Sequence, residues 1–377
     1  MPDLIVSSDI DTLLSSASSS AARTNLGLGA ADTVEFGSMS GVIGLADSTG
    51  VVLAANSLSL VGAKLVLSDF VKEGGKTLSF YSNAAVEVRA TGTAVENGTA
   101  LEAAYVLAKT LTPNDAALSS TNRARLVIGD GRYDLSGDLA IDAEFVDIIG
   151  PSKFSMRDKT ITSAAALMQI GGGNLSVSAN DVFVSGVAMA TGSSINIVGT
   201  KPLQVFENCL SAGGDGFGGG IGGVAAGSFT QCASSSGGFG GNGGTASGKF
   251  TDCVAFGGRA FGGNDGIASG VFIRCSASQG DYSFGGGGVC SGTFTECSVP
   301  ATSTGDFGTY NAAFGTGITS GVFIRCAGGV AAFGADGGTF SGQLLWSTIG
   351  NTTPPLITGA GKIRMCLDSA YTELNAG

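Results

Sequence analysis

Hydrophobic positions recur at a nearly fixed interval between about residue 206 and residue 366. The clearest copies read Ser-Gly-x-Phe-x-x-Cys, in which the aromatic and the cysteine are set among polar residues and glycines. The cysteines are Cys209, Cys232, Cys253, Cys275, Cys297 and Cys326. Each follows an aromatic by three positions, at Phe206, Phe229, Phe250, Phe272, Phe294 and Phe323. The slot then stays in phase at Leu344 with Ser347 and at Ile363 with Cys366. A period of about 22 residues predicts a solenoid with one repeat per coil.

The composition of each repeat indicates the kind of solenoid. Helical repeats need about 33 to 47 residues, whereas this unit is shorter and rich in Gly, Ser, Thr, Val and Phe. Those residues favour short strands joined by tight turns. The Leu-x-x-Leu-x-Leu pattern of leucine-rich repeats is absent. The sequence therefore predicts an all-β fold, a parallel β-helix whose strands stack about 4.8 Å apart.

The spacing within the repeat predicts a bend. Phe272 and Cys275 are three positions apart, so a straight strand would place them on opposite faces. Both side chains favour burial, so we expect the backbone to turn between them, at Arg274.

One copy of the repeat, Phe206-Glu-Asn-Cys209, has the aromatic-x-Asn-Cys form that coils of the pectin-lyase-like family often carry. The chain resembles that family over roughly residues 120 to 366. The resemblance implies a single-stranded, right-handed parallel β-helix. It implies no activity, because the same fold serves enzymes, adhesins and viral spikes.

The N-terminal part has a different pattern. The segment from Arg23 to Gly37 is similar to a short repeat found in tail fibres of tailed bacteriophages, so residues 1–40 are interpreted as an attachment or stalk segment. Residues 41–95 contain short alternating strands with few large apolar residues. We expect this region to bury its apolar faces against other copies of the chain, most simply in a homotrimer.

A helix is predicted between these strands and the solenoid. Leu101, Ala104, Tyr105, Ala108 and Leu111 share one face, with Thr99 and Glu102 as a capping box. We expect it to cover the open end of the first coil, where a bare strand edge would aggregate. The predicted boundaries are 96–125 for the capping helix and linker, 126–343 for the β-helix, and 344–377 for the last coils and a C-terminal cap.

Charge and cysteine usage exclude several classes of partner. The chain has 377 residues, a net charge of −11 and no histidine. This argues against nucleic acid and anionic membranes as partners, and no apolar run is long enough to insert into a membrane. Six of the eight cysteines share one slot, which predicts a buried column of reduced thiols rather than disulfides or a metal site. Neither metal nor cofactor is predicted. No signal peptide is visible, so we expect folding in the host cytoplasm.

Two sets of residues are candidates for chemistry. Asp252, Arg274, Glu296 and Arg325 occupy the bend slot in successive coils and predict a ladder of alternating charge rather than a catalytic pair. The coil between Cys297 and Cys326 is seven residues longer than the usual 22. Its insertion is either a tolerated surface loop or a binding loop, and in the second case the candidate glycan or receptor contacts are Asp306, Thr309, Tyr310 and Asn311.

These patterns favour a structural virion protein of a tailed phage, such as a tail fibre or tailspike. Its N-terminus would attach to other tail or baseplate proteins, and its β-helix would contact host surface polysaccharide. Two alternatives stay open. One is a polysaccharide lyase or hydrolase on the same β-helix, and the other is a bacterial adhesin, which the lack of a visible signal peptide disfavours.

Overall fold

The computed structural model describes the part of the chain that carries the repeat. The described residues are 84–153, 167–218, 221–235, 237–241, 243–256, 260–263, 265–277, 283–285, 288–299, 318–328, 339–348, 362–367 and 373–376. All of them belong to the second of two compact units, Leu78–Gly377. The predicted segment 1–40 and all but the end of the region 41–95 lie outside the described residues.

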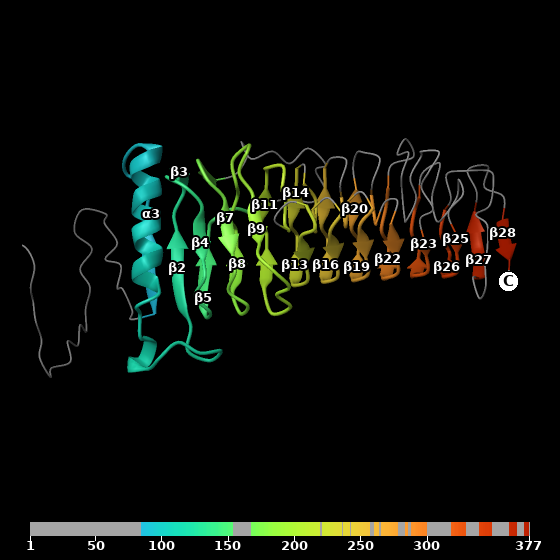
Figure 1. The fold of residues 1–377 in the computed structure, drawn as a ribbon, viewed down its shortest axis with the longest axis horizontal. Coiled ribbons are helices and arrows are strands. Elements are labelled where there is room, and N and C mark those ends of the chain that lie inside the picture. The colour runs from blue at the N-terminus through green and yellow to red at the C-terminus, as the bar shows by residue number, and fades with distance from the viewer. Residues whose placement is uncertain are drawn as a thin grey trace, which may run out of the picture. The chain divides into compact units, whose positions relative to one another are not determined.

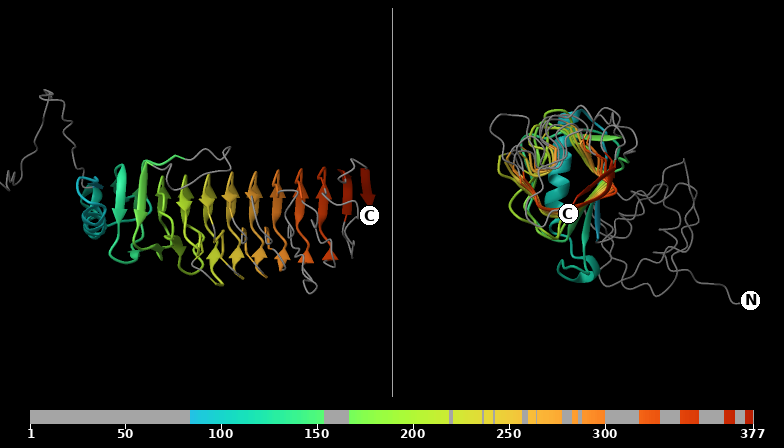
Figure 2. Two further views of the ribbon diagram at one scale, coloured as in Figure 1. Left: turned by 90° about the horizontal axis from the view of Figure 1, so that it is seen from above. Right: turned by 90° about the vertical axis from the view of Figure 1, so that its right-hand side faces the viewer.

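The described chain is a parallel β-solenoid with turns of about 22 residues, as the repeat predicted (Figures 1 and 2). One 13-stranded sheet runs its whole length, and every pairing in it is parallel except the last, between β27 and β28. Its strands are β1 (Ala85–Val88), β2 (Ala124–Ile128), β5 (Val146–Ile149), β8 (Phe183–Ser185), β10 (Val205–Glu207), β13 (Ser228–Thr230), β16 (Lys249–Thr251), β19 (Val271–Ile273), β22 (Thr293–Thr295), β24 (Val322–Ile324), β26 (Gln343–Leu345), β27 (Lys362–Leu367) and β28 (Glu373–Ala376).

Shorter sheets form the other sides of the coils. Two of these sheets lie on the side of the coil that follows the long sheet along the chain. The first pairs β3 (Gly131–Asp134) with β6 (Met168–Gly171). The second contains β11 (Leu210–Ser211), β14 (Ala233–Ser234), β17 (Val254–Ala255) and β20 (Ser276–Ala277). On the remaining side a three-stranded sheet contains β4 (Leu139–Ile141), β7 (Leu175–Val177) and β9 (Ile195–Ile197). A six-stranded sheet follows it with β12 (Val224–Ala225), β15 (Thr245–Ala246), β18 (Ile267–Ala268), β21 (Val289–Cys290), β23 (Ile318–Thr319) and β25 (Thr339–Phe340).

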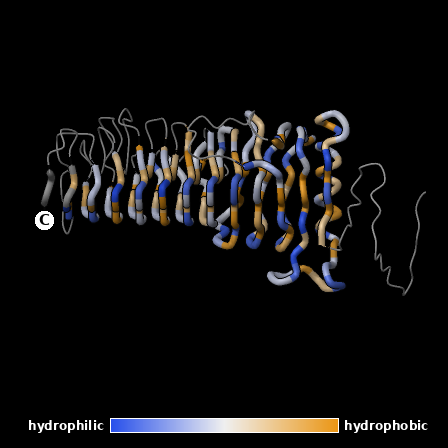
Figure 3. Tube along the Cα trace, turned by 180° about the vertical axis from the view of Figure 1, so that it is seen from behind, coloured by the Kyte–Doolittle hydropathy of each residue, from blue (hydrophilic) through white to orange (hydrophobic). Residues whose placement is uncertain are grey.

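Two columns of phenylalanine fill the interior of the repeat. The first contains Phe206, Phe229, Phe250, Phe272, Phe294 and Phe323, which are exact register partners on neighbouring strands. Their rings stack with centroids 4.7 to 5.1 Å apart. The second contains Phe217, Phe239, Phe261 and Phe284, stacked at 4.6 to 5.0 Å. The two columns meet edge to face, and all ten rings are fully buried. Figure 3 shows hydrophobic and hydrophilic segments alternating along each coil.

The predicted bend is present in the six repeats from Phe206 to Cys326. The residue before each cysteine of the column has a positive φ, between 51° and 56°, at Asn208, Gln231, Asp252, Arg274, Glu296 and Arg325. This left-handed conformation turns the chain so that the aromatic and the cysteine both face inward. The N–H of Arg274 donates to Thr295 O in the next coil at 2.9 Å, and the equivalent bonds recur along the column. We call this place in the coil the bend position.

The cysteine after the bend packs its thiol against backbone carbonyls. Cys275 Sγ lies 3.4 Å from Phe250 O and 3.5 Å from Ile273 O. Where Ser347 replaces cysteine, its hydroxyl donates to the equivalent carbonyl of Leu345 at 2.9 Å. The slot therefore suits a small side chain that donates a weak hydrogen bond. All eight cysteines are buried, including the six of the predicted column, and Cys290 lies in β21 and belongs to a different column.

The N-terminal end differs from its predicted boundaries. β1 pairs in parallel with β2, so the long sheet begins at Ala85 and not near residue 126. Helix α3 (Ala94–Ala108) crosses this end of the stack and contacts β1, β2 and β3 (Figure 1). A short 3-10 helix, η1 (Pro113–Asp115), follows it. Strand β1 is too short to be recognised as part of a solenoid from its own sequence.

The helix buries the predicted face but begins earlier than predicted. Four of the five predicted apolar residues are buried, and Leu111 packs partly against the core. The capping box is made by Thr93 and Glu96, so the prediction of Thr99 with Glu102 was wrong. Both pairs have the required spacing, and the loop that follows β1 decides between them. Glu102 instead accepts hydrogen bonds from the backbone N–H and the hydroxyl of Ser136.

The side chain of Tyr105 joins helix α3 to the first coil by hydrogen bonds. Its hydroxyl accepts hydrogen bonds from the backbone N–H groups of Asp142 (2.9 Å) and Ala143 (3.0 Å). It also donates to the Asp142 carboxylate at 3.1 Å. Burial raises the pKa of Tyr105 to about 12.

In the described part of the chain, no helix is long and apolar enough to cross a membrane.

We predict that the thiols are inert in the folded protein. Burial raises the pKa of Cys232, Cys275, Cys290 and Cys297 well above the ordinary value. A thiol reagent at pH 8 should therefore find almost no reactive thiol before denaturation, and eight after denaturation without reductant. Stability should fall as the pH rises above about 8.5, because only the unfolded chain then releases these protons. Fewer than eight thiols after denaturation would show disulfides and contradict the prediction.

Candidate functional site

The predicted contact residues of the long coil, Asp306, Thr309, Tyr310 and Asn311, lie outside the described residues. Strand β23, which follows the insertion, stacks on β21 with Val289 opposite Ile318. The coil thus returns to the regular register after the insertion. The assignment of these four residues to glycan or receptor contact stays a prediction.

The charged residues at the bend position form two separate ion pairs. Arg274 Nε lies 2.6 Å from Asp252 Oδ1, and its Nη2 lies 2.8 Å from Oδ2 of the same carboxylate. Arg325 Nη2 lies 2.6 Å from Glu296 Oε1. The hydrogen bond to Asp252 raises the pKa of Arg274, with a smaller contribution from Glu296. The carboxylates of Asp252 and Glu296 are held in ion pairs, which fits the predicted structural role of these residues rather than a catalytic one.

A third charged cluster, which the sequence did not indicate, joins the first three coils. Arg123 bonds to Asp147 at 2.6 Å and to Asp181 at 2.7 Å. Asp147 is only 7% exposed, and its Oδ1 also accepts the N–H of Phe183 at 3.0 Å. The bond to Asp147 is the main cause that raises the pKa of Arg123. These residues are up to 58 positions apart, so only the fold brings them together.

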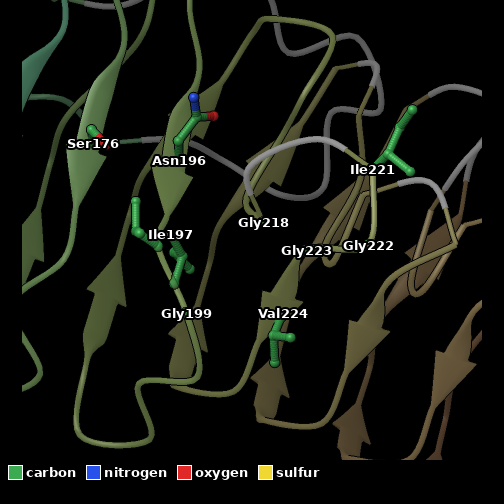
Figure 4. Close-up of a pocket in the computed structure, with 10 residues that line it drawn as sticks. Ser176, Asn196, Ile197, Gly199, Gly218, Ile221, Gly222, Gly223 and Val224 are labelled. Carbon is green, nitrogen blue, oxygen red and sulfur yellow. The ribbon is translucent and has the colours of Figure 1, made fainter.

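A pocket lies where one side of the solenoid is interrupted. Strands β9 and β12 occupy successive coils, yet they belong to different sheets and do not pair. The N–H of Ile195 on β9 donates to the side-chain hydroxyl of Ser211 at 3.0 Å rather than to a backbone carbonyl of β12. The pocket has a volume of ≈ 290 Å³. Figure 4 shows Ser176, Asn196 and Ile197 on one side of it, and Ile221 and Val224 on the other.

The lining of the pocket is uncharged and mixes polar with apolar residues. It combines the Asn196 amide and the Ser176 hydroxyl with apolar walls, of which Ile221 is 87% exposed. Asn196 Oδ1 is buried and has no hydrogen-bond partner among the described residues. Such a lining suits a small neutral polar group. Sequence reasoning missed this pocket because Ser176 and Asn196 are single polar residues in ordinary strand positions.

Among the described residues, no three side chains of the metal-ligating types converge. No protein-family model matches the chain, and neither a curated protein nor a solved structure is significantly similar to it. What is established is the parallel β-solenoid, a fold that serves structural and carbohydrate-active proteins alike.

The ion pairs lead to one prediction. Replacing Arg274 with Glu puts a carboxylate beside Asp252 and near Glu296, so the melting temperature should fall slightly in low salt. The difference should shrink in 0.5 M salt, because exposed charges are screened. The control is Lys249→Glu, which reverses the charge of an exposed residue that has no ion pair among the described residues. Equal melting temperatures for both variants in low salt would contradict a contribution from the pair.

The Asn196 Oδ1 atom in the pocket leads to a second prediction, which concerns stability. An unsatisfied buried polar group destabilises a protein, and valine favours a strand more than asparagine does. Asn196→Val should therefore raise the free energy of unfolding by about 1 kcal/mol, measured by denaturant titration. Ser176→Val is the matched control, since Ser176 is the register partner of Asn196 on β7. A less stable Asn196→Val variant would mean that the amide makes a bond that stabilises the folded state.

Proposed function

We propose that this chain is a structural virion protein of a tailed phage, the shaft of a tail fibre or tailspike that contacts host surface glycans. The observation that carries the proposal is the length of regular core. One sheet continues from β1 to β28, and stacked phenylalanines fill the repeat from Phe206 to Phe323. A uniform core of this kind suits a stiff spacer that holds its ends apart.

The ends of the solenoid support a role as a self-contained shaft. Helix α3 covers the first coil, and at the other end the last strand, β28, pairs antiparallel with β27. Bare edges of a parallel sheet would recruit further strands. The helix over the first coil prevents further parallel strands from adding there, and the antiparallel last strand interrupts the parallel pairing at the other end.

Attachment and assembly are assigned to the N-terminal part. The resemblance of the segment Arg23 to Gly37 to phage tail fibres motivates this assignment, together with the sparse apolar residues of the following region. The protein would be a homotrimer in the virion, bound to tail or baseplate proteins through its N-terminus. A polysaccharide lyase or hydrolase on the same β-helix is the second candidate. It has less support because the carboxylates of Asp252 and Glu296 form ion pairs with arginines.

Sedimentation of the full chain tests the proposal. It should sediment as a trimer at micromolar concentration, because strands that lack large apolar residues are buried only between chains. Deleting residues 1–83 should leave a folded, strand-rich rod that is monomeric or weakly associated. The deletion stops before β1, since removing residues up to 95 would take away the first strand and the helix cap.

Two results would overturn the assignment. A full chain that stays monomeric would remove the support for a fibre. Release of new reducing ends or unsaturated sugars from surface polysaccharide of a susceptible host would favour the lyase or hydrolase instead.

A further inference from the structure

The pocket beside Asn196 opens between two strand edges. Strand β9 is the last strand of its three-stranded sheet, and β12 is the first strand of the six-stranded sheet. On β9, Ser194 O and the N–H of Val198 bond to residues of β7. The backbone groups of alternate residues point to opposite sides of a strand. Those of Ile197 therefore face away from β7 and toward the next coil.

The edge of β12 faces the same gap from the other coil. Gly223 O and Ala225 O accept hydrogen bonds from the coil that follows β12. By the same alternation, the backbone groups of Val224 point back toward β9. Ile197 and Val224 both line the pocket. The pocket is therefore bordered by backbone donors and acceptors that no strand of its own sheet pairs, and such groups need partners.

The amide of Asn196 adds a polar side chain to this border. Its Oδ1 is buried and has no hydrogen-bond partner among the described residues, which destabilises the fold. Ser176, its register partner on β7, lines the same pocket with a hydroxyl. A half-turn of the amide exchanges its oxygen and its nitrogen, so it can present either an acceptor or two donors to a ligand. Serine and asparagine together match the hydroxyl groups of a sugar.

The opposite wall of the pocket is apolar and accessible. Ile221 and Val224 stand across from Asn196 (Figure 4), and Ile221 is 87% exposed. None of the described residues that line the pocket is charged. Lys201 lies beside the lining residue Gly199, with its Cε 3.9 Å from where a Cβ on Gly199 would be. An uncharged lining with one polar and one apolar wall suits a ligand that has both kinds of face.

We propose that this pocket binds one neutral pyranose unit of a host glycan. The apolar face of the sugar ring would lie on Ile221 and Val224, and its hydroxyls would exchange hydrogen bonds with Asn196 and Ser176. The volume of ≈ 290 Å³ is at the small end of ligand pockets, which measure about 300 to 1,000 Å³, so it suits a single ring. A sugar carboxylate is disfavoured, because burying a charge without a partner is costly. The site rests on the proposed contact with host glycans, for which it supplies the place and the chemistry.

Saturation-transfer difference NMR on the full-length protein tests the site. The neutral probes are the methyl glycosides of glucose, galactose, mannose, rhamnose and N-acetylglucosamine, and the charged probes are the methyl glycosides of glucuronate and galacturonate. At least one neutral glycoside should give a saturable signal. Both uronates should bind at least tenfold more weakly than the best neutral glycoside.

Two variants locate the binding within the pocket. Asn196→Val should weaken binding of the best neutral glycoside at least tenfold while raising the free energy of unfolding, so the loss is not a loss of folding. Ile221→Ser changes an exposed residue, so it should keep the melting temperature and weaken binding at least threefold. The control is Thr339→Val, which also places valine at a polar strand position but on β25, at the other end of the six-stranded sheet. It should bind like the unmodified chain.

The outcomes separate this site from the proposed function. Binding that Asn196→Val or Ile221→Ser leaves unchanged would overturn the site and keep a glycan-contacting shaft. A uronate that binds as tightly as the best neutral glycoside would overturn the neutral class and point to Lys201. A trimeric protein that binds none of the sugars would overturn the site without touching the shaft. A monomeric full chain would overturn the proposed function itself, even if it bound a sugar in the pocket.

Discussion

The structure depends on one coincidence of lengths. Strands of a parallel sheet lie about 4.8 Å apart, and aromatic rings on register partners here stack at 4.6 to 5.1 Å. The backbone hydrogen bonds and the ring stacking therefore demand the same rise per coil, and each holds the other in register. A shift of one residue would turn every phenylalanine of a coil outward. The two columns also touch edge to face, so the interior is fixed across the coil as well as along it.

The bend position makes this interior possible in so short a coil. A turn at positive φ lets an aromatic and a cysteine three positions apart both point inward. It also leaves carbonyl groups facing the core, and the thiols of the cysteine column lie against them. The side chain at the bend is directed to solvent and is free to vary in type. That freedom explains why the same position holds Asp252, Arg274 and Trp346 in different coils.

Features that distinguish one part of the rod from another appear where the repeat is broken. The pocket exists because β9 and β12 fail to pair. A regular solenoid offers the same surface in every coil and so has no reason to bind a ligand at one place. Departures from the repeat are thus the places where a partner can be recognised.

The sequence by itself determined the solenoid, its coil length, the inward positions of phenylalanine and cysteine, and the bend between them. It could do so because each was repeated in several coils, so that periodicity revealed which residues share an environment. Features that occur only once in the chain were decided by the tertiary structure. Thr93 rather than Thr99 caps the helix, β1 belongs to the long sheet, and Arg123 meets Asp147 and Asp181. These depend on contacts between distant segments of the chain, for which the local pattern contains no repeated signal. The pocket beside Asn196 has the same origin, since it arises from two strands that do not meet.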